Sequence, residues 1–161
     1  MNSLASRLFI AFLLALILTI LPMPELLLGA RPLWVLMLVL YIQFYMADYF
    51  NLILLFVLGL LLDVLLSTVI GEHTLALSLV TWLASKKSRR FYFYSIGQQM
   101  TSIGFFCFLY QLIILTIDAF LGFHLSLISV IGSTGISIIL WPWVRLIAEE
   151  SLLVKVRYSR S

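Results

Sequence analysis

Asp63 is the residue whose type and position could carry chemistry, because it stands alone in the stretch GLLLDVLL at residues 59–66. At the centre of a membrane helix a carboxylate raises the free energy of insertion by about 2.5–3.5 kcal/mol, whereas each large apolar neighbour lowers it by roughly 0.3–0.6 kcal/mol. Such a carboxylate can relay protons or ions, or it can hold helices together. Transport relays usually contain several intramembrane ionisable groups, and the next candidate, Asp118, is expected at a helix end. A structural role for Asp63 is therefore the favoured interpretation.

Small and polar residues recur every four positions through this run, at Gly59, Asp63, Ser67 and Gly71. On one helix they would form a stripe along a single side. Small residues let another helix approach closely, so we expect the stripe to face protein and not lipid. Arg31 begins the preceding apolar run at the same side of the membrane, and we predict an ion pair between Asp63 and Arg31.

Glu72, His73 and His124 could be drawn as a zinc site in the outer loops. Zinc ligands on a helix are commonly four positions apart on one face, and these residues contain no such pair. The sequence therefore predicts no metal site. It also contains no phosphate-binding glycine loop, so no cofactor is expected.

The stretch GSTG at residues 132–135 is faintly similar to the nucleophile segment of intramembrane serine proteases. Its serine is out of register, and no catalytic histidine lies on a neighbouring apolar run. The favoured interpretation is a small-residue surface for close helix contact, formed by Ser129, Ser133 and Ser137 with Gly132 and Gly135. No catalytic residue is predicted, and the protein is not expected to be an enzyme.

The composition explains why these polar residues are so few. Of 161 residues, 63% are hydrophobic and 11% are charged, and the mean hydropathy is +1.16. These values are typical of an integral membrane protein, and we expect one polytopic membrane domain over residues 1–161. The formal charge of +3 is interpreted as a signal for membrane orientation, with no nucleic acid as a partner.

Six apolar runs separated by Pro, Gly or charged residues predict an all-α bundle of six transmembrane helices. The expected spans are residues 8–21, 33–46, 50–70, 74–85, 91–117 and 125–148, followed by a cytoplasmic tail at 149–161. The second and fourth spans are short against the roughly 20 residues that a crossing needs. The sequence leaves open whether Phe91 to Gln99 is interfacial or spanning.

The basic residues predict an orientation with both termini in the cytoplasm. With six spans, nine of the ten fall inside: Arg7, Lys86, Lys87, Arg89, Arg90, Arg145, Lys155, Arg157 and Arg160. Only Arg31 falls outside, as the positive-inside rule favours. A count of five or seven spans would place either KKSRR or the basic tail on the outer side.

Aromatic residues near the ends of the predicted spans are expected to anchor the protein at the membrane interface. Trp34 lies near an outer end, and Trp141 and Trp143 lie near a cytoplasmic end. Pro142 between them should kink or end the sixth helix, because proline lacks a backbone donor. Arg145 could then extend toward the lipid headgroups.

Three segments together resemble the rod shape-determining protein MreD family. They are RPLW at residues 31–34, GLLLDVLLSTVIGEHTLALSLV at 59–80, and LWPWVRL at 140–146. The resemblance covers residues 21–146 in order and spacing. Two departures are the residues Glu72 and His73, in a loop where the family varies, and the stretch FYFYSIGQQ, which is not a family mark.

The resemblance implies a non-enzymatic protein of the bacterial inner membrane that supports rod shape and side-wall peptidoglycan synthesis as part of the elongasome. Its implied partners are the bitopic protein MreC, together with MreB, RodA and the partner transpeptidase of RodA. Membrane lipid is also an expected partner. Self-association, and which helices contact a partner, stay open.

The family is also similar in fold to the substrate-binding S component of energy-coupling-factor transporters. This similarity gives the alternative function, a component of a small-molecule, vitamin-type transporter. Ala11 and Ala15 match the small-residue spacing with which those transporters dock their coupling subunit. A transporter needs a pocket with several convergent polar groups, whereas a scaffold needs surfaces that face other proteins.

Overall fold

The computed structural model describes residues 2–22, 24, 31–123 and 126–153. Within these residues the chain forms helices and no strand, which confirms the all-α fold class. The α-helices are α1 (Asn2–Ile20), α2 (Trp34–Tyr45), α3 (Leu52–Leu65), α4 (Glu72–Ser85), α5 (Ser88–Phe91), α6 (Ile96–Phe120) and α7 (Leu127–Ala148). A 3-10 turn, η2 (Ala47–Tyr49), precedes α3, and a π-helical turn, η3 (Glu149–Leu153), continues α7.

The six long helices follow the order of the six predicted apolar runs, but two boundaries differ by five residues. The helix expected over residues 50–70 ends at Leu65. The helix expected from residue 91 begins at Ile96, because Ser95 and Gln98 form a capping box at that point. Before this helix, residues Ser88–Phe91 form the short helix α5, which was not predicted.

Pro142 was expected to kink or to end the sixth predicted helix, and it does not end it. α7 continues through Pro142 to Ala148. Within the described part of the chain, two helical stretches are long and apolar enough to cross a membrane: α6, with 25 residues, and Leu127–Leu152, with 26. Helices α2, α3 and α4 have 12 to 14 residues, so each extends about 18–21 Å against a hydrocarbon core of about 30 Å. The count of six spans and the orientation stay predictions.

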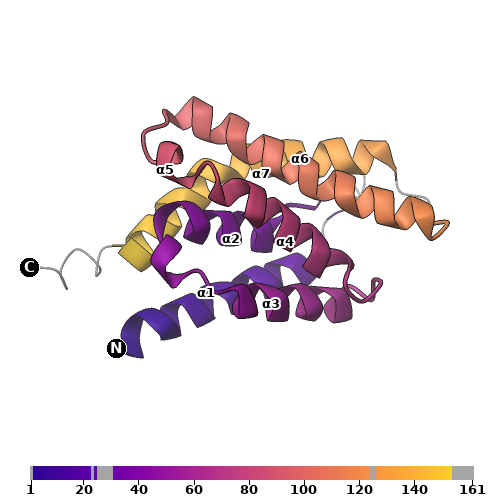
Figure 1. Cartoon of the computed structure of the whole chain (residues 1–161), viewed down its shortest axis with the longest axis horizontal. Helices are drawn as coiled ribbons and strands as arrows, with labels where there is room; N and C mark the ends of the chain where they lie inside the picture. The colour runs from indigo at the N-terminus through magenta and orange to yellow at the C-terminus, as the bar shows by residue number, and fades with distance from the viewer. Residues whose placement is uncertain (1, 23, 25–30, 124–125, 154–161) are drawn as a thin grey trace, which may run out of the picture.

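Helix α2 lies at the centre of the bundle. Every residue from Val35 to Phe44 is buried, because α1, α4, α6 and α7 all contact this helix. Figure 1 shows α6 and α7 along one side, α1 and α3 along the other, and α2 and α4 between them. A helix that is apolar on every face suits this fully enclosed position.

The outer helices expose large apolar side chains. Phe9 on α1, Ile53 on α3, Phe120 on α6 and Ile131 on α7 are each more than three-fifths exposed. Apolar exposure over so much of a surface is rare on soluble monomers. It is compatible with a protein whose outer faces contact lipid chains.

Candidate functional site

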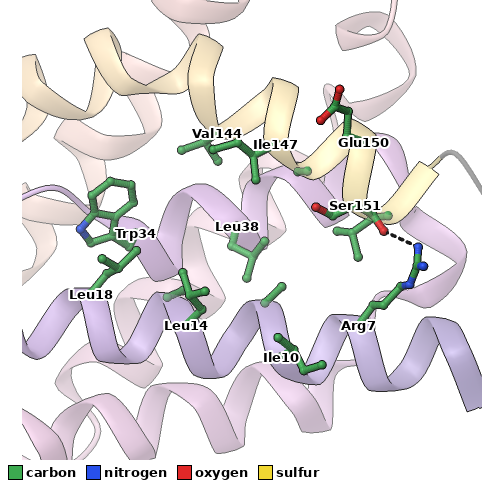
Figure 2. A pocket seen from close by; sticks show the side chains of 14 residues that line it. Arg7, Ile10, Leu14, Leu18, Trp34, Leu38, Val144, Ile147, Glu150 and Ser151 are labelled. Atoms are coloured by element: carbon green, nitrogen blue, oxygen red, sulfur yellow. Dashed lines mark hydrogen bonds between the residues drawn. The ribbon is translucent and has the colours of Figure 1, made fainter.

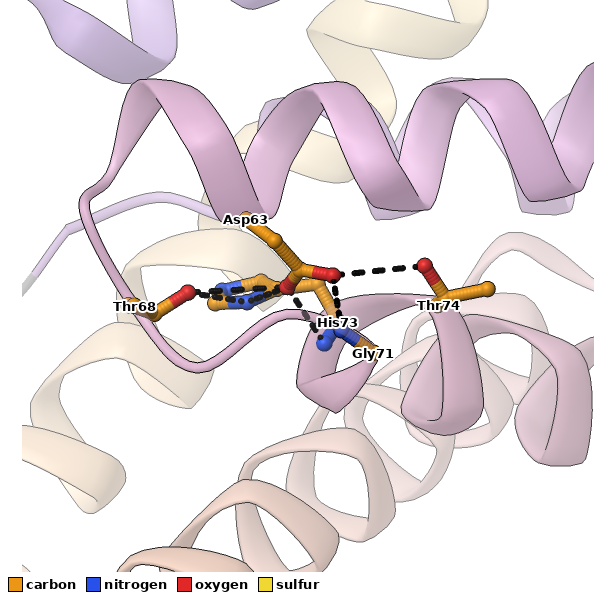
Figure 3. A network of polar contacts seen from close by, with 5 residues as sticks. All are labelled: Asp63, Thr68, Gly71, His73 and Thr74. Carbon is orange, nitrogen blue, oxygen red and sulfur yellow. Dashed lines mark hydrogen bonds and ion pairs between the residues drawn. The ribbon is translucent and has the colours of Figure 1, made fainter.

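The Asp63 carboxylate lies at the N-terminus of α4, although Asp63 itself belongs to α3. It is fully buried. Its Oδ2 accepts the backbone N–H of Gly71 at 2.7 Å, and its Oδ1 accepts the backbone N–H of His73 at 2.9 Å (Figure 3). The first N–H groups of a helix have no partners within the helix, and they carry partial positive charge. Asp63 therefore caps α4 from the neighbouring helix.

Side chains complete the shell around this carboxylate. His73 Nδ1 lies 3.0 Å from Oδ1, and Thr74 Oγ1 donates to Oδ2 at 3.3 Å. Thr68 Oγ1 lies 3.5 Å from Oδ1 and 3.2 Å from His73 Nδ1. The contact between Nδ1 and Oδ1 is a hydrogen bond in the tautomer that carries its proton on Nδ1. Both oxygens are thus supplied with donors, as a buried charge requires.

The turn between α3 and α4 brings these donors to Asp63. α3 ends at Leu65, and the N–H of Thr68 then donates back to the carbonyl of Asp63 at 3.0 Å. Ser67 has a φ of 53° and Gly71 a φ of 100°. Glycine adopts this left-handed conformation at little cost, so Gly71 lets the chain reverse into α4 with its N–H directed at the carboxylate.

Gly59 lies one turn before Asp63 and sets the distance between the two helices. A Cβ at this glycine would lie 2.5 Å from the backbone Cα of Thr74, which is closer than two carbon atoms can pack. Gly59 and Asp63 therefore both face α4. The other two members of the expected stripe are not on the helix: Ser67 is exposed in the turn, and Gly71 is the N-cap of α4.

The predicted ion pair between Asp63 and Arg31 does not form in the described part of the chain. The Asp63 carboxylate instead lies 3.0 Å from His73 Nδ1, and the Arg31 side chain is exposed. The main chain at Arg31 is held elsewhere, since its N–H donates to Ser133 Oγ at 3.0 Å, and Leu33 N–H donates to Ser137 Oγ at 3.1 Å. Two serines of the expected helix-contact surface thus fix the segment that leads into α2.

The polar group of Asp63, His73 and Thr68 is not arranged as a catalytic triad. In a triad the acid holds one imidazole nitrogen and the other nitrogen activates the nucleophile. Here the Asp63 carboxylate and the Thr68 hydroxyl both contact Nδ1, so the threonine is not activated by a base. The arrangement joins two helices and a turn.

Glu72 and His73 were expected in an outer loop, and this placement is wrong. They are the first two residues of α4, and both are buried. In the described part of the chain no three His, Cys, Asp or Glu side chains come together as a metal site. His124, the third member of the zinc arrangement considered above, lies outside the described residues.

The Glu72 carboxylate faces a cavity of about 270 Å³ at the same end of the bundle. Both of its oxygens are buried and have no hydrogen-bond partner among the described residues. The cavity is also lined by polar side chains of other elements, namely Thr19, Arg31, Thr68, His73, Tyr110, Gln111 and Asp118. Sequence reasoning missed this cavity, because Tyr110 and Gln111 lie in an apolar run and only the packing of α6 against α4 brings them to Glu72.

The expected interface anchors have different positions. Trp141 is wholly buried, and its ring packs edge-on against Phe91 with the centroids 6.2 Å apart. The prediction that Trp141 anchors the protein at the membrane interface is therefore wrong. Trp143, two positions later, is 65% exposed, and a helix turns successive side chains by about 100°. Trp34 is partly buried against the core.

Arg145 was expected to extend toward lipid headgroups, but its side chain is partly buried and binds Gln99. Its Nη1 donates to Gln99 Oε1 at 3.0 Å. The same oxygen accepts the Tyr45 hydroxyl at 3.2 Å, and Gln99 Nε2 donates to the Tyr94 carbonyl at 3.1 Å. This polar cluster ties α2, α6 and α7 together at the end of the bundle opposite Asp63.

Comparison with known proteins identifies one family. The family model of the rod shape-determining protein MreD matches residues 3–150. The match contains all three segments from which the resemblance was inferred, at residues 31–34, 59–80 and 140–146, so the resemblance is confirmed. No solved structure matches the chain, and the expected similarity to transporter S components stays a prediction.

Proposed function

Because the chain belongs to the rod shape-determining protein MreD family, we propose that it is a non-enzymatic inner-membrane component of the bacterial elongasome. The family assigns it to rod shape determination. The finer proposal is that it binds MreC and helps to organise the wall synthase, RodA with its partner transpeptidase, near MreB. The observation that carries this proposal is the family match over residues 3–150.

Residence in the inner membrane with several crossings is supported by the outer surface of the bundle. Two helices are long enough to span, and the faces of α1, α3, α6 and α7 that point outward are apolar. Shorter helices such as α2 can lie within the membrane when other helices enclose them. We therefore propose a multi-pass protein with both termini in the cytoplasm.

An apolar groove between α1 and α7 offers a place for the transmembrane helix of MreC. It has a volume of about 480 Å³, and Figure 2 shows Ile10, Leu14 and Leu18 of α1 opposite Val144 and Ile147. Ala11 and Ala15 lie in the wall of the groove, and small residues let a helix backbone approach closely.

Polar contacts occur only at one end of this groove among its described residues. Arg7 Nη1 donates to the carbonyl of Ser151 at 2.8 Å (Figure 2), which links the start of α1 to η3. This end is the predicted cytoplasmic end, because Arg7 is one of the basic residues assigned there. The rest of the groove would suit an apolar helix that crosses the membrane beside α1.

The test is affinity purification of the tagged protein from native membranes after crosslinking in cells, with partners identified by mass spectrometry. Recovery of MreC with the wall synthase supports the proposal. Ala11→Leu, which fills the groove, should reduce MreC recovery, whereas Ala5→Leu on an exposed part of α1 should not. Recovery of MreC that is equal in both variants would exclude the groove and leave the scaffold role.

A transporter component is the second candidate function. The observation that favours it is the cavity beside Glu72, where polar groups of several helices converge. Recovery of a membrane coupling subunit with ATPases, and of no wall proteins, would support this candidate and contradict the scaffold.

A further inference from the structure

Glu72 is a buried carboxylate that the fold leaves without a partner. The residue is 3% exposed, and neither carboxylate oxygen accepts a hydrogen bond from a described residue. An unpaired charge in such a place costs several kcal/mol unless it is neutralised or paired.

The groups around Glu72 leave the cavity with negative charge. Asp118, in the last turn of α6, is the second carboxylate in the lining, and it has no ion pair with any described residue. His73 is already bound to Asp63. Arg31 also lines the cavity, but it forms no ion pair with either carboxylate. The cavity therefore contains two acceptors of positive charge that no described side chain satisfies.

The size of the cavity indicates the kind of cation. Its volume is about 270 Å³, whereas a water molecule occupies about 30 Å³, so a bare metal ion would fill little of it. The described residues also provide no group of three metal ligands. A guanidinium or ammonium group on a short alkyl chain fills more of the space, and its apolar part can contact Leu62 and Ile114 in the same lining.

We propose that this cavity binds an organic cation, with the Glu72 carboxylate as its counter-ion. A guanidinium matches best, because both Glu72 oxygens are free and a guanidinium donates two parallel hydrogen bonds to a carboxylate. Asp118 adds a second negative charge, and Tyr110 and Gln111 add neutral polar groups. The cation is either a free small molecule or the basic side chain of another protein.

The first experiment measures thermal unfolding of the full chain in lipid nanodiscs, by tryptophan fluorescence, during titration with N-acetyl-arginine methylamide. The unfolding midpoint should rise and saturate. The same titration of Glu72→Gln should give no rise, while Asp48→Asn, at an exposed carboxylate of η2, should respond like the unchanged protein. The citrulline analogue, which is neutral and of nearly the same shape, should have no effect.

Two results would overturn the proposal. One is an equal rise in the unchanged protein and in Glu72→Gln, which would place the binding elsewhere. The other is the absence of any rise in the unchanged protein at concentrations that leave the Asp48→Asn control folded, which would mean that Glu72 is buried as a neutral acid. The comparison holds whatever the stability of Glu72→Gln, because each variant is measured against its own midpoint.

The second experiment identifies the source of the cation. A photoreactive amino acid in place of Gln111, which lines the cavity, is activated in cells. An adduct to a lysine- or arginine-containing peptide, lost in Glu72→Gln, would support a basic side chain of a partner. No protein adduct, together with a positive titration, would support a free small molecule. Recovery of MreC does not depend on either result, so failure of this proposal and failure of the scaffold role are distinguishable.

Discussion

Asp63 and Glu72 are two buried carboxylates on either side of one turn, and the fold treats them in opposite ways. Asp63 accepts the backbone N–H groups of Gly71 and His73 and the hydroxyl of Thr74, and it contacts the imidazole of His73. Glu72 accepts none from the described residues. Both lie near the N-terminus of α4, where the helix dipole favours negative charge. The difference is that the backbone N–H groups of Gly71 and His73 are both directed at Asp63.

Burial alone therefore does not assign a role to an acid. A carboxylate with a complete set of donors is part of the framework, because removing it leaves those donors unpaired. A carboxylate without donors adds nothing to the framework and is available to a ligand. Four substitutions test this distinction, and a fifth test concerns the predicted pair of Asp63 with Arg31.

Asp63→Ala should have the largest effect. It leaves the N–H groups of Gly71 and His73 and the imidazole without their acceptor, and we expect the free energy of unfolding to fall by about 3–5 kcal/mol. Chemical unfolding in detergent micelles measures the change. The exposed Asp48→Ala is the control, and a similar loss in both would contradict the role of Asp63 as a cap.

Asp63→Asn tests the same role with a smaller change, and we expect the free energy of unfolding to fall by about 1–3 kcal/mol. The two backbone donors point at different oxygens, Gly71 at Oδ2 and His73 at Oδ1. An amide has a single oxygen, so one N–H must face the amide nitrogen. A stability equal to that of the unchanged protein would show that the turn rearranges around the amide.

Gly59→Ala tests whether Asp63 reaches α4 only because the two helices approach so closely. The added Cβ would meet the Thr74 backbone at 2.5 Å, so the helices must separate, with an expected loss of about 1–3 kcal/mol. Gly135→Ala is the matched control, since a Cβ there meets nothing within 4 Å and should stabilise α7 by up to about 1 kcal/mol. Equal effects in the two variants would contradict the close approach.

Glu72→Gln should change stability in the direction opposite to Asp63→Asn. Removing a buried charge that has no partner should raise the free energy of unfolding by about 1 kcal/mol when no cation is bound. Chemical unfolding in a buffer free of amines and guanidines measures it. A loss as large as that of Asp63→Asn would erase the contrast between the two acids.

The smallest effect concerns Arg31. Because Arg31 does not pair with Asp63 in the structure, the double change Arg31→Ala with Asp63→Ala should equal the sum of the single changes within about 0.5 kcal/mol. A double-mutant cycle in micelles measures the coupling. If the double change lowers the free energy of unfolding by much less than the sum of the single changes, the ion pair predicted from the sequence would be supported.

The order of the six long helices could be predicted because apolar runs and polar breaks alternate clearly along the chain. The ends of the helices could not. α3 was expected to reach residue 70, since its apolar pattern continues past Leu65, yet the chain turns at that point and the N–H of Thr68 donates to the Asp63 carbonyl. Apolar residues suit a turn at the end of a membrane helix as well as a helix, so hydrophobicity gives no stop signal there.

The partners of the polar residues were also decided by tertiary structure. Asp63 was singled out correctly as a buried carboxylate, but its partner is His73 and not Arg31. Trp141 and Arg145 were assigned to the membrane interface and lie instead against the core and against Gln99. In a helix whose every face is apolar, periodicity does not distinguish the side that faces lipid from the side that faces protein.

The sequence by itself determined the all-helical class, the family and the presence of an isolated acid at residue 63, because these follow from composition and from short motifs. Tertiary structure alone decided that Asp63 caps α4 and that Glu72 faces a cavity. Both outcomes depend on the direction in which α4 leaves the turn at Gly71. That direction is fixed by the close packing of Gly59 against Thr74 and by donors that become available only when the turn has formed.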